Sequence, residues 1–137
     1  MKDLKYVLAY ITPLGALMGL WLQGFWVFFT PFFTFILVPF LETILPIAKQ
    51  NLSQKELLSK DKNKFFNVIL YLNIPIVYGL IGYFLWSLSF EQYSITELVG
   101  LTISLGIVVG ANGINIAHEL GHRKLHFERV FGKILLL

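Results

Sequence analysis

Four long apolar runs dominate the sequence, at about residues 6–22, 25–48, 65–88 and 95–119. A helix of about 20 apolar residues spans the hydrocarbon core of a bilayer. The lysines and arginines form three clusters outside these runs: Lys2 and Lys5; Lys49, Lys55, Lys60, Lys62 and Lys64; and Arg123, Lys124, Arg129 and Lys133. Because positive residues are retained in cytoplasmic loops, the pattern predicts four transmembrane helices with the N-terminus and the end of the fourth helix in the cytoplasm.

The composition excludes an ordinary soluble domain. Of the 137 residues, 56% are hydrophobic and 14% are charged, and the mean hydropathy is +0.70. Soluble domains carry roughly a quarter charged residues. We therefore expect an all-α integral membrane protein, a bundle of four transmembrane helices in contact with membrane lipid. The net charge of +3 follows from the loop clusters, so we expect no nucleic-acid partner. The chain has no cysteine, which leaves histidine, carboxylate or water to bind any metal.

Residues 49–64 form the one soluble-looking segment, which we expect to be a cytoplasmic loop. A helix-capping signal at residues 51–56 predicts a short surface helix. Contact with lipid headgroups is the simpler role for its basic residues. The alternative is a docking surface for an acidic electron donor, made by Lys55, Lys60, Lys62 and Lys64.

The candidate functional residues lie in the stretch Asn115–Arg123, at the predicted cytoplasmic end of the fourth run. In a helix, His118 and His122 lie one turn apart on one face, about 6 Å apart along the axis. Both imidazoles can then turn toward one metal ion. Glu119 lies beside them and could act as a second-shell carboxylate, a ligand or a base. Ionisable residues at the edge of a membrane span indicate a functional site.

Other polar residues within the apolar runs could form a second shell or a substrate path. Asn112 and Asn115 precede His118 at three-residue steps, which predicts a polar stripe on one face of the fourth helix. Glu42 is either an interfacial acid or a polar group that faces the bundle interior near the metal end. Small residues recur along the fourth run and allow close helix packing: Gly100, Ser104, Gly106, Gly110, Ala111 and Gly113.

The residues alone leave three interpretations of the histidines open. They could simply meet lipid headgroups at a helix end. They could instead form the H-E-x-x-H motif of a membrane zinc metallopeptidase, with Glu119 as general base. That site needs a third ligand, and His126 lies about 12 Å from His118 along a straight helix. The third interpretation is a histidine-rich non-haem iron oxygenase, which needs more histidines than the three present.

A family resemblance favours the oxygenase. Residues 113–124, followed by Phe127-Glu128-Arg129 and Lys133-Ile134, closely resemble the first histidine box of the bacterial alkane 1-monooxygenases. These enzymes belong to the membrane fatty acid desaturase and hydroxylase superfamily. The Gly-x-Asn-x-Ala lead and the basic residues after the box extend the resemblance beyond H-E-x-x-H. The four apolar runs and Pro39-Phe40-Leu41-Glu42 resemble the N-terminal half of that family.

The resemblance implies an activity and its partners. His118 and His122 would be iron ligands of a non-haem di-iron site, with Glu119 as a ligand or in the second shell and His126 as a surface residue. The enzyme would use O2 to hydroxylate the terminal methyl group of an alkane, with electrons from a rubredoxin-type donor. The spans would form the corridor for the alkane substrate. Its location would be the bacterial inner (cytoplasmic) membrane, with several spans and a cytoplasmic histidine box.

The resemblance also implies that residues 1–137 are the N-terminal transmembrane part of a fatty acid desaturase-like domain. The later histidine boxes of the family are absent from these residues, and a new apolar run begins at Ile134. We therefore expect a truncated chain that is inactive alone. Two related activities stay open: a fatty acyl desaturase or hydroxylase, and an alkyl-aromatic monooxygenase.

Overall fold

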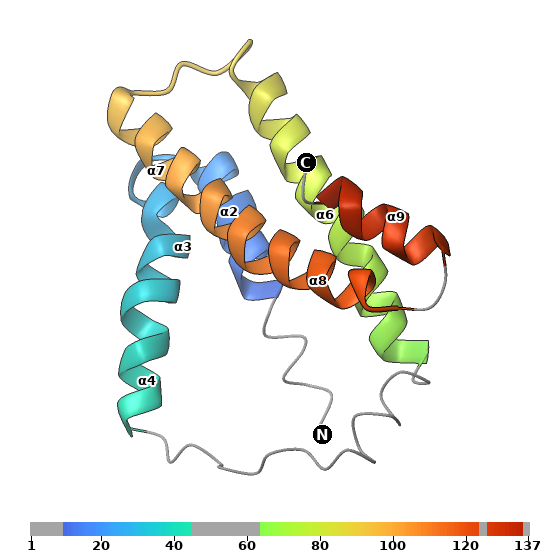
Figure 1. Cartoon of the computed structure of the whole chain (residues 1–137). Coiled ribbons are helices and arrows are strands. Elements are labelled where there is room, and N and C mark those ends of the chain that lie inside the picture. The colour runs from blue at the N-terminus through green and yellow to red at the C-terminus, as the bar shows by residue number, and fades with distance from the viewer. Residues whose placement is uncertain (1–9, 45–63, 124–125, 136–137) are drawn as a thin grey trace.

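The computed structural model describes residues 10–44, 64–123 and 126–135 (Figure 1). Within these ranges the chain consists of helices and connecting turns and contains no strand. The helices follow in the order α2 (Ile11–Leu22), η2 (Gly24–Phe28), α3 (Phe29–Phe32), η3 (Phe33–Leu37), α4 (Val38–Ile44), α6 (Lys64–Ser87), α7 (Ile95–Ile107), η4 (Val108–Ile114), α8 (Asn115–Gly121) and α9 (His126–Leu135). The predicted all-α class is therefore confirmed for the described residues.

Three helices in the described part of the chain are long and apolar enough to cross a membrane: Gly24–Ile44, Asn67–Ser87 and Ile95–Gly121. They lie where the second, third and fourth spans are expected. The helix α2 is apolar but has 12 residues, about 18 Å, whereas the hydrocarbon core is about 30 Å thick. Residues 1–9 lie outside the described residues, so the first predicted span stays a prediction. Residues 49–63 of the expected loop, with the capping signal, also lie outside them, whereas Lys64 begins α6.

Two turns meet at one end of the bundle, which we call the hairpin end. The first is the break at Gln23-Gly24 between α2 and η2, where both residues have a positive φ. The second precedes α7, whose N-terminus carries a capping box formed by Ser94 and Glu97. The Glu97 carboxylate accepts hydrogen bonds from the backbone N–H groups of Ser94 and Gly24, both at 2.8 Å. One side chain therefore caps a helix and joins the two turns.

Small residues let α2, η2 and α7 approach closely near the hairpin end. A Cβ atom at Gly100 would lie 2.4 Å from Val27 Cγ2, and one at Gly19 would lie 3.1 Å from Val27 Cα. Val27 and Leu101 are fully buried between these helices. The predicted close packing is thus confirmed at Gly100. It does not extend to Gly106, where an added Cβ would meet no atom within 4 Å.

The second span is irregular around its prolines, as the sequence predicts. It passes from a 3-10 helix (η2) through α3 to a π-helix (η3) and then α4. Pro31 has no N–H to donate to the Val27 carbonyl four residues earlier. Ser104 on α7 donates a hydrogen bond from Oγ to that carbonyl oxygen at 2.7 Å. A polar contact between spans thus compensates for the proline. Pro46, the last proline of this apolar run, lies outside the described residues.

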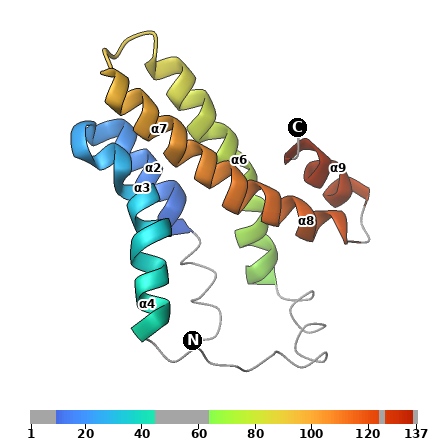
Figure 2. The same cartoon turned by 60° about the vertical axis from the view of Figure 1, so that its left-hand side comes forward.

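The other end of the long α7–η4–α8 helix carries the residues 115–123, which we call the histidine end. There α9 turns back and packs on α8 (Figure 2). A Cβ atom at Gly132 of α9 would lie 2.9 Å from the Ala117 carbonyl oxygen of α8, so the two backbones nearly touch. Leu120 is fully buried in the apolar cluster between α6, α8 and α9. The histidine helix is therefore held from two sides.

Candidate metal centre

A buried chain of amide side chains fixes the segment that leads into the histidine end. Asn112 lies in the π-helix η4, a helix type that is rare and often found at functional sites. Its Oδ1 accepts a hydrogen bond from Thr12 Oγ1 at 2.9 Å. Its Nδ2 donates to Asn73 Oδ1 at 3.1 Å, and Asn73 Nδ2 donates to the Tyr10 hydroxyl at 3.0 Å. Asn112 therefore ties η4 to α6 and to the start of α2.

Asn115 does not share this environment. Its side chain is exposed, and its Nδ2 donates to the Ala111 carbonyl oxygen of the same helix at 2.6 Å. Asn112 is buried. The predicted polar stripe on one face is therefore wrong, because the π-helical turns of η4 do not keep residues at three-residue steps on one side.

The candidate ligands His118 and His122 leave consecutive turns at the end of α8. His118 lies in the last turn of the helix, and His122 is its C-cap residue. The His122 N–H donates to the His118 carbonyl oxygen at 3.3 Å, so the helical path continues from one residue to the other. Both side chains are exposed. Among the described residues, neither imidazole has a hydrogen-bond or ion-pair partner.

This pair, which we call the histidine pair, fits two positions of a metal coordination sphere. Imidazole nitrogen is a ligand for iron and zinc alike, and both rings are accessible and not otherwise engaged. Within residues 10–44, 64–123 and 126–135, no group of three or more His, Cys, Asp or Glu residues lies close enough to hold a metal. The described part of the chain thus offers two ligands and not a complete site.

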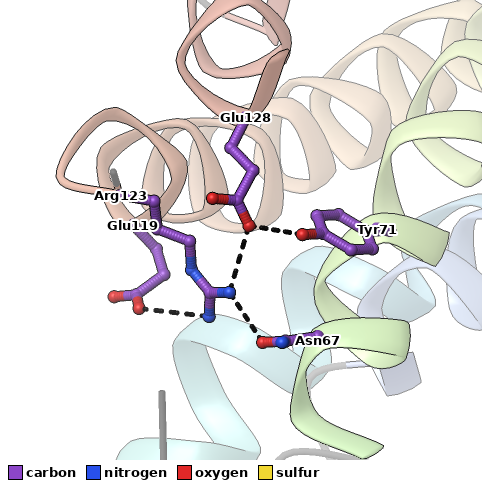
Figure 3. A network of polar contacts seen from close by, with 5 residues as sticks. All are labelled: Asn67, Tyr71, Glu119, Arg123 and Glu128. Carbon is purple, nitrogen blue, oxygen red and sulfur yellow. Dashed lines mark hydrogen bonds and ion pairs between the residues drawn. The ribbon is translucent and has the colours of Figure 1, made fainter. Parts of the chain in front are cut away.

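Glu119 belongs to a polar network beside the histidine pair (Figure 3). Its Oε1 lies 3.8 Å from Arg123 Nη2. Arg123 Nη1 donates to Asn67 Oδ1 at 2.7 Å and to Glu128 Oε1 at 3.2 Å. The Tyr71 hydroxyl donates to the same Glu128 oxygen. The network therefore joins α6, the end of α8 and α9.

Sequence reasoning did not assign this network. A weak signal was present, because Asn67 and Tyr71 are four residues apart in an apolar run and so share one helix face. Burial adds the missing information. The Arg123 side chain is 9% exposed and that of Glu128 4% exposed, whereas that of Glu119 is 46% exposed. The sequence pattern therefore did not reveal that Arg123 and Glu128 are two buried, opposite charges beside the candidate metal site.

The remaining candidates lie away from the histidine pair. Glu42 is exposed on α4, and both views place α4 well apart from α8 and α9 (Figures 1 and 2). The described residues therefore do not bring Glu42 to the histidine pair, and its role in a second shell or substrate path stays a prediction. His126 begins α9 and is exposed, as a surface residue should be.

An apolar cavity of about 260 Å³ lies between α2 and α6. Tyr10 and Tyr83 contribute its polar groups, and Pro13 and Pro75 face it from the two helices. The other lining residues are apolar or glycine: Leu14, Leu17, Ile76, Gly79 and Leu80. Tyr10 also belongs to the amide chain that reaches Asn112. The cavity is thus linked through side chains to the segment that carries the histidine pair.

The fold and the site together define a class: a helical membrane protein with two exposed histidines, one helical turn apart, at the end of a span. Comparison with known proteins narrows that class. The chain is 29% identical over 136 residues to alkane 1-monooxygenase 1 of Alcanivorax borkumensis, covering 96% of the chain and 33% of that protein. Alkane 1-monooxygenase of Pseudomonas putida is also 29% identical, covering 98% of the chain and 35% of that protein. No protein-family model matches the chain.

A third relative has a different named substrate. The xylene/toluene monooxygenase hydroxylase component of Pseudomonas putida is 26% identical, covering 100% of the chain and 36% of that protein. The chain spans about a third of the length of the curated relatives it matches. It is therefore a distant relative of the alkane 1-monooxygenases, as the histidine-box resemblance indicates.

Proposed function

We propose that the chain forms the N-terminal transmembrane part, with four spans, of a non-haem di-iron monooxygenase that hydroxylates the terminal methyl group of alkanes. The observation that carries this proposal is similarity to alkane 1-monooxygenases over 96–98% of the chain, including the box that holds the histidine pair. His118 and His122 are two of the iron ligands. The other ligands lie outside the described residues.

The iron would activate O2, and the chain would position the histidine ligands of the iron. The imidazoles of the histidine pair bind metal through their unprotonated nitrogens. Their orientation depends on α8, whose path is set by Asn112 in η4 and by the packing of α9. Residues that fix the geometry of a metal site control its reactivity as much as the ligands do.

The apolar cavity between α2 and α6 is the proposed entry for the alkyl chain. An alkane partitions into the bilayer, and an apolar lining offers it no competing hydrogen bonds. The Gly79 backbone lines the cavity, and a Cβ added there would meet no atom within 4 Å. The absence of a side chain at Gly79 therefore leaves room in the cavity for a linear alkyl chain.

Electrons would come from a rubredoxin-type donor at the histidine end. The cytoplasmic cluster Lys55, Lys60, Lys62 and Lys64 would offer an acidic donor a complementary surface. The proposal accordingly has the histidine end on the cytoplasmic side of a bacterial inner membrane.

The test is conversion of octane to 1-octanol by membranes that carry the protein expressed from its natural gene, supplied with O2 and reduced rubredoxin. The proposal predicts O2-dependent 1-octanol formation that is lost in His122→Ala. Product formation that persists without O2, or in His122→Ala, would contradict it. Zinc in place of iron in the purified protein would favour the metallopeptidase alternative.

Hydroxylation of a methyl group on an aromatic ring is a second candidate function. The similarity to the xylene/toluene monooxygenase component favours it. The same membranes given toluene in place of octane would form benzyl alcohol. The ratio of the two rates, at matched aqueous concentrations, decides between an alkane enzyme and an alkyl-aromatic one.

A further inference from the structure

Arg123 is a buried cation that three helices share, directly after the histidine pair. Its Nη1 donates to Asn67 Oδ1 on α6 at 2.7 Å and to Glu128 Oε1 on α9 at 3.2 Å. Its Nη2 faces Glu119 Oε1 at 3.8 Å (Figure 3). The arginine side chain is 9% exposed and the Glu119 side chain 46% exposed. Arg123 is therefore the buried partner in this ion pair, and Glu119 is the exposed one.

The guanidinium plane is fixed by contacts that do not involve Glu119. Glu128 is buried, and the Tyr71 hydroxyl donates to the same carboxylate oxygen that Arg123 Nη1 contacts. A buried charge is costly unless its partners satisfy it. Asn67 and Glu128 provide such partners on two different helices. Arg123 thus presents Nη2 to Glu119 in a set position, and a lysine ammonium could not reach both sides at once.

The Glu119 side chain leaves α8 in a different direction from that of His118. The two are consecutive residues of the helix, about 100° apart around its axis. Arg123 follows the C-cap residue His122 and lies beyond the end of α8. The ion pair with Arg123 holds the Glu119 carboxylate toward α6 and α9, whose side chains hold Arg123.

We propose that Arg123 is a positioning residue that keeps the Glu119 carboxylate out of the coordination sphere of a metal bound by the histidine pair. This inference rests on the proposed metal-binding role of that pair. Its consequence is a site with imidazole ligands alone from this stretch. Carboxylate oxygen and imidazole nitrogen favour different metals, so Arg123 contributes to metal selection. The ion pair with Arg123 would also prevent Glu119 from acting as the general base that an H-E-x-x-H peptidase requires.

Cobalt(II) titration of the protein expressed from its natural gene, purified in detergent, tests the inference without an activity assay. The visible absorption of bound cobalt reports both affinity and the ligand set. Glu119→Gln should leave affinity and spectrum unchanged, because Glu119 is not a ligand. Arg123→Gln should tighten binding by about fivefold, the size expected for a half-exposed ion pair, and change the spectrum as Glu119 becomes a ligand. In the Glu119→Gln background, Arg123→Gln should have no effect.

The matched control is Arg129→Gln, which removes an exposed arginine charge on α9. It should bind cobalt as the wild-type chain does. A change as large as that of Arg123→Gln would show that loss of any nearby positive charge sets the affinity, and would overturn the inference. Weakened binding in Glu119→Gln would overturn it too, since Glu119 would then be a ligand.

Two outcomes separate this inference from the proposed function. If His118→Ala abolishes cobalt binding but Arg123→Gln changes neither affinity nor spectrum, the inference fails and the metal role of the histidine pair stands. If the wild-type chain shows no cobalt binding that depends on His118, both fail together. Equal weakening by Arg123→Gln with and without Glu119 would indicate damage to the fold, and would also contradict the inference.

Discussion

Both ends of the bundle contain close backbone contacts and a polar link between segments, but they differ in where their charged side chains lie: Glu97 at the hairpin end is partly exposed, and Glu128 at the histidine end is buried. At the hairpin end, backbones and side chains are in close contact: added Cβ atoms at Gly15 and Gly100 would lie 2.5 Å and 2.4 Å from Phe29 and Val27. At the histidine end, the candidate ligands are exposed, and the buried Arg123 and Glu128 join the helices by polar contacts. The comparison teaches that close packing holds the spans together, while polar networks set the direction of the site.

That division predicts which substitutions damage the fold and which damage the site. Gly100→Leu has the largest expected effect on stability. Its side chain would collide with Val27, and overpacking of this kind costs roughly 1–3 kcal/mol. The measurement is unfolding of the purified protein in mixed micelles with increasing SDS. Gly106→Leu on the same helix is the control and should be nearly neutral, because Gly106 faces open space. Equal losses in both variants would contradict the close packing at Gly100.

Substitution in the cavity should change substrate choice with little change in stability. Gly79→Phe would place a ring in the space between α2 and α6, and we expect at least about a tenfold lower rate on a long alkane. The control is Gly82→Phe, one helical turn away and outside the cavity lining. The measurement is the ratio of hydroxylation rates on octane and hexadecane. An unchanged ratio in Gly79→Phe would remove this cavity from the substrate path.

Loss of one polar contact between spans should have a smaller effect. Ser104→Ala removes the hydrogen bond to the Val27 carbonyl that Pro31 cannot satisfy. We expect a loss of about 0.5–1.5 kcal/mol in SDS unfolding. Thr102→Ala, at an exposed position of the same helix, should change stability by less. A neutral Ser104→Ala would show that the carbonyl finds another partner or that the contact is not formed in the bilayer.

The smallest expected effect concerns electron transfer. If Lys60 and Lys62 help to dock an acidic donor, raising the ionic strength should slow electron transfer by a few-fold. The measurement is the rate of rubredoxin oxidation by membranes at several salt concentrations. Lys60→Gln with Lys62→Gln should reduce both the rate and its salt dependence. A rate that is independent of salt would assign these lysines to the lipid surface.

Sequence reasoning reached the membrane fold through patterns that depend on local chemistry. Apolar run lengths predict where the spans lie, and Pro31 predicts an irregular second helix. Three of the four expected spans appear among the described helices. The break between the first two helices could also be predicted, because Gln23-Gly24 interrupts the apolar sequence there. The Ser94–Glu97 capping box carries a local signal too, but nothing local shows that Glu97 also binds Gly24.

The candidate site was less predictable, because its partners come from distant parts of the chain. A heptad or alternating pattern cannot show that Arg123 meets Asn67, 56 residues away, or that Asn112 meets Asn73. The π-helix η4 also changes which residues share a face, so the three-residue spacing of Asn112 and Asn115 misled the prediction. The separation of α4 from α8 likewise depends on tertiary packing, which no local pattern around Glu42 reveals.

The most direct test of the account is the iron content of the purified protein and of its histidine variants, measured by elemental analysis. The account predicts that iron is the bound metal and that His118→Ala and His122→Ala each abolish it. His126→Ala, which changes an exposed histidine outside the pair, should keep the wild-type content. Normal iron in His118→Ala or His122→Ala, or zinc as the bound metal, would contradict the central claim.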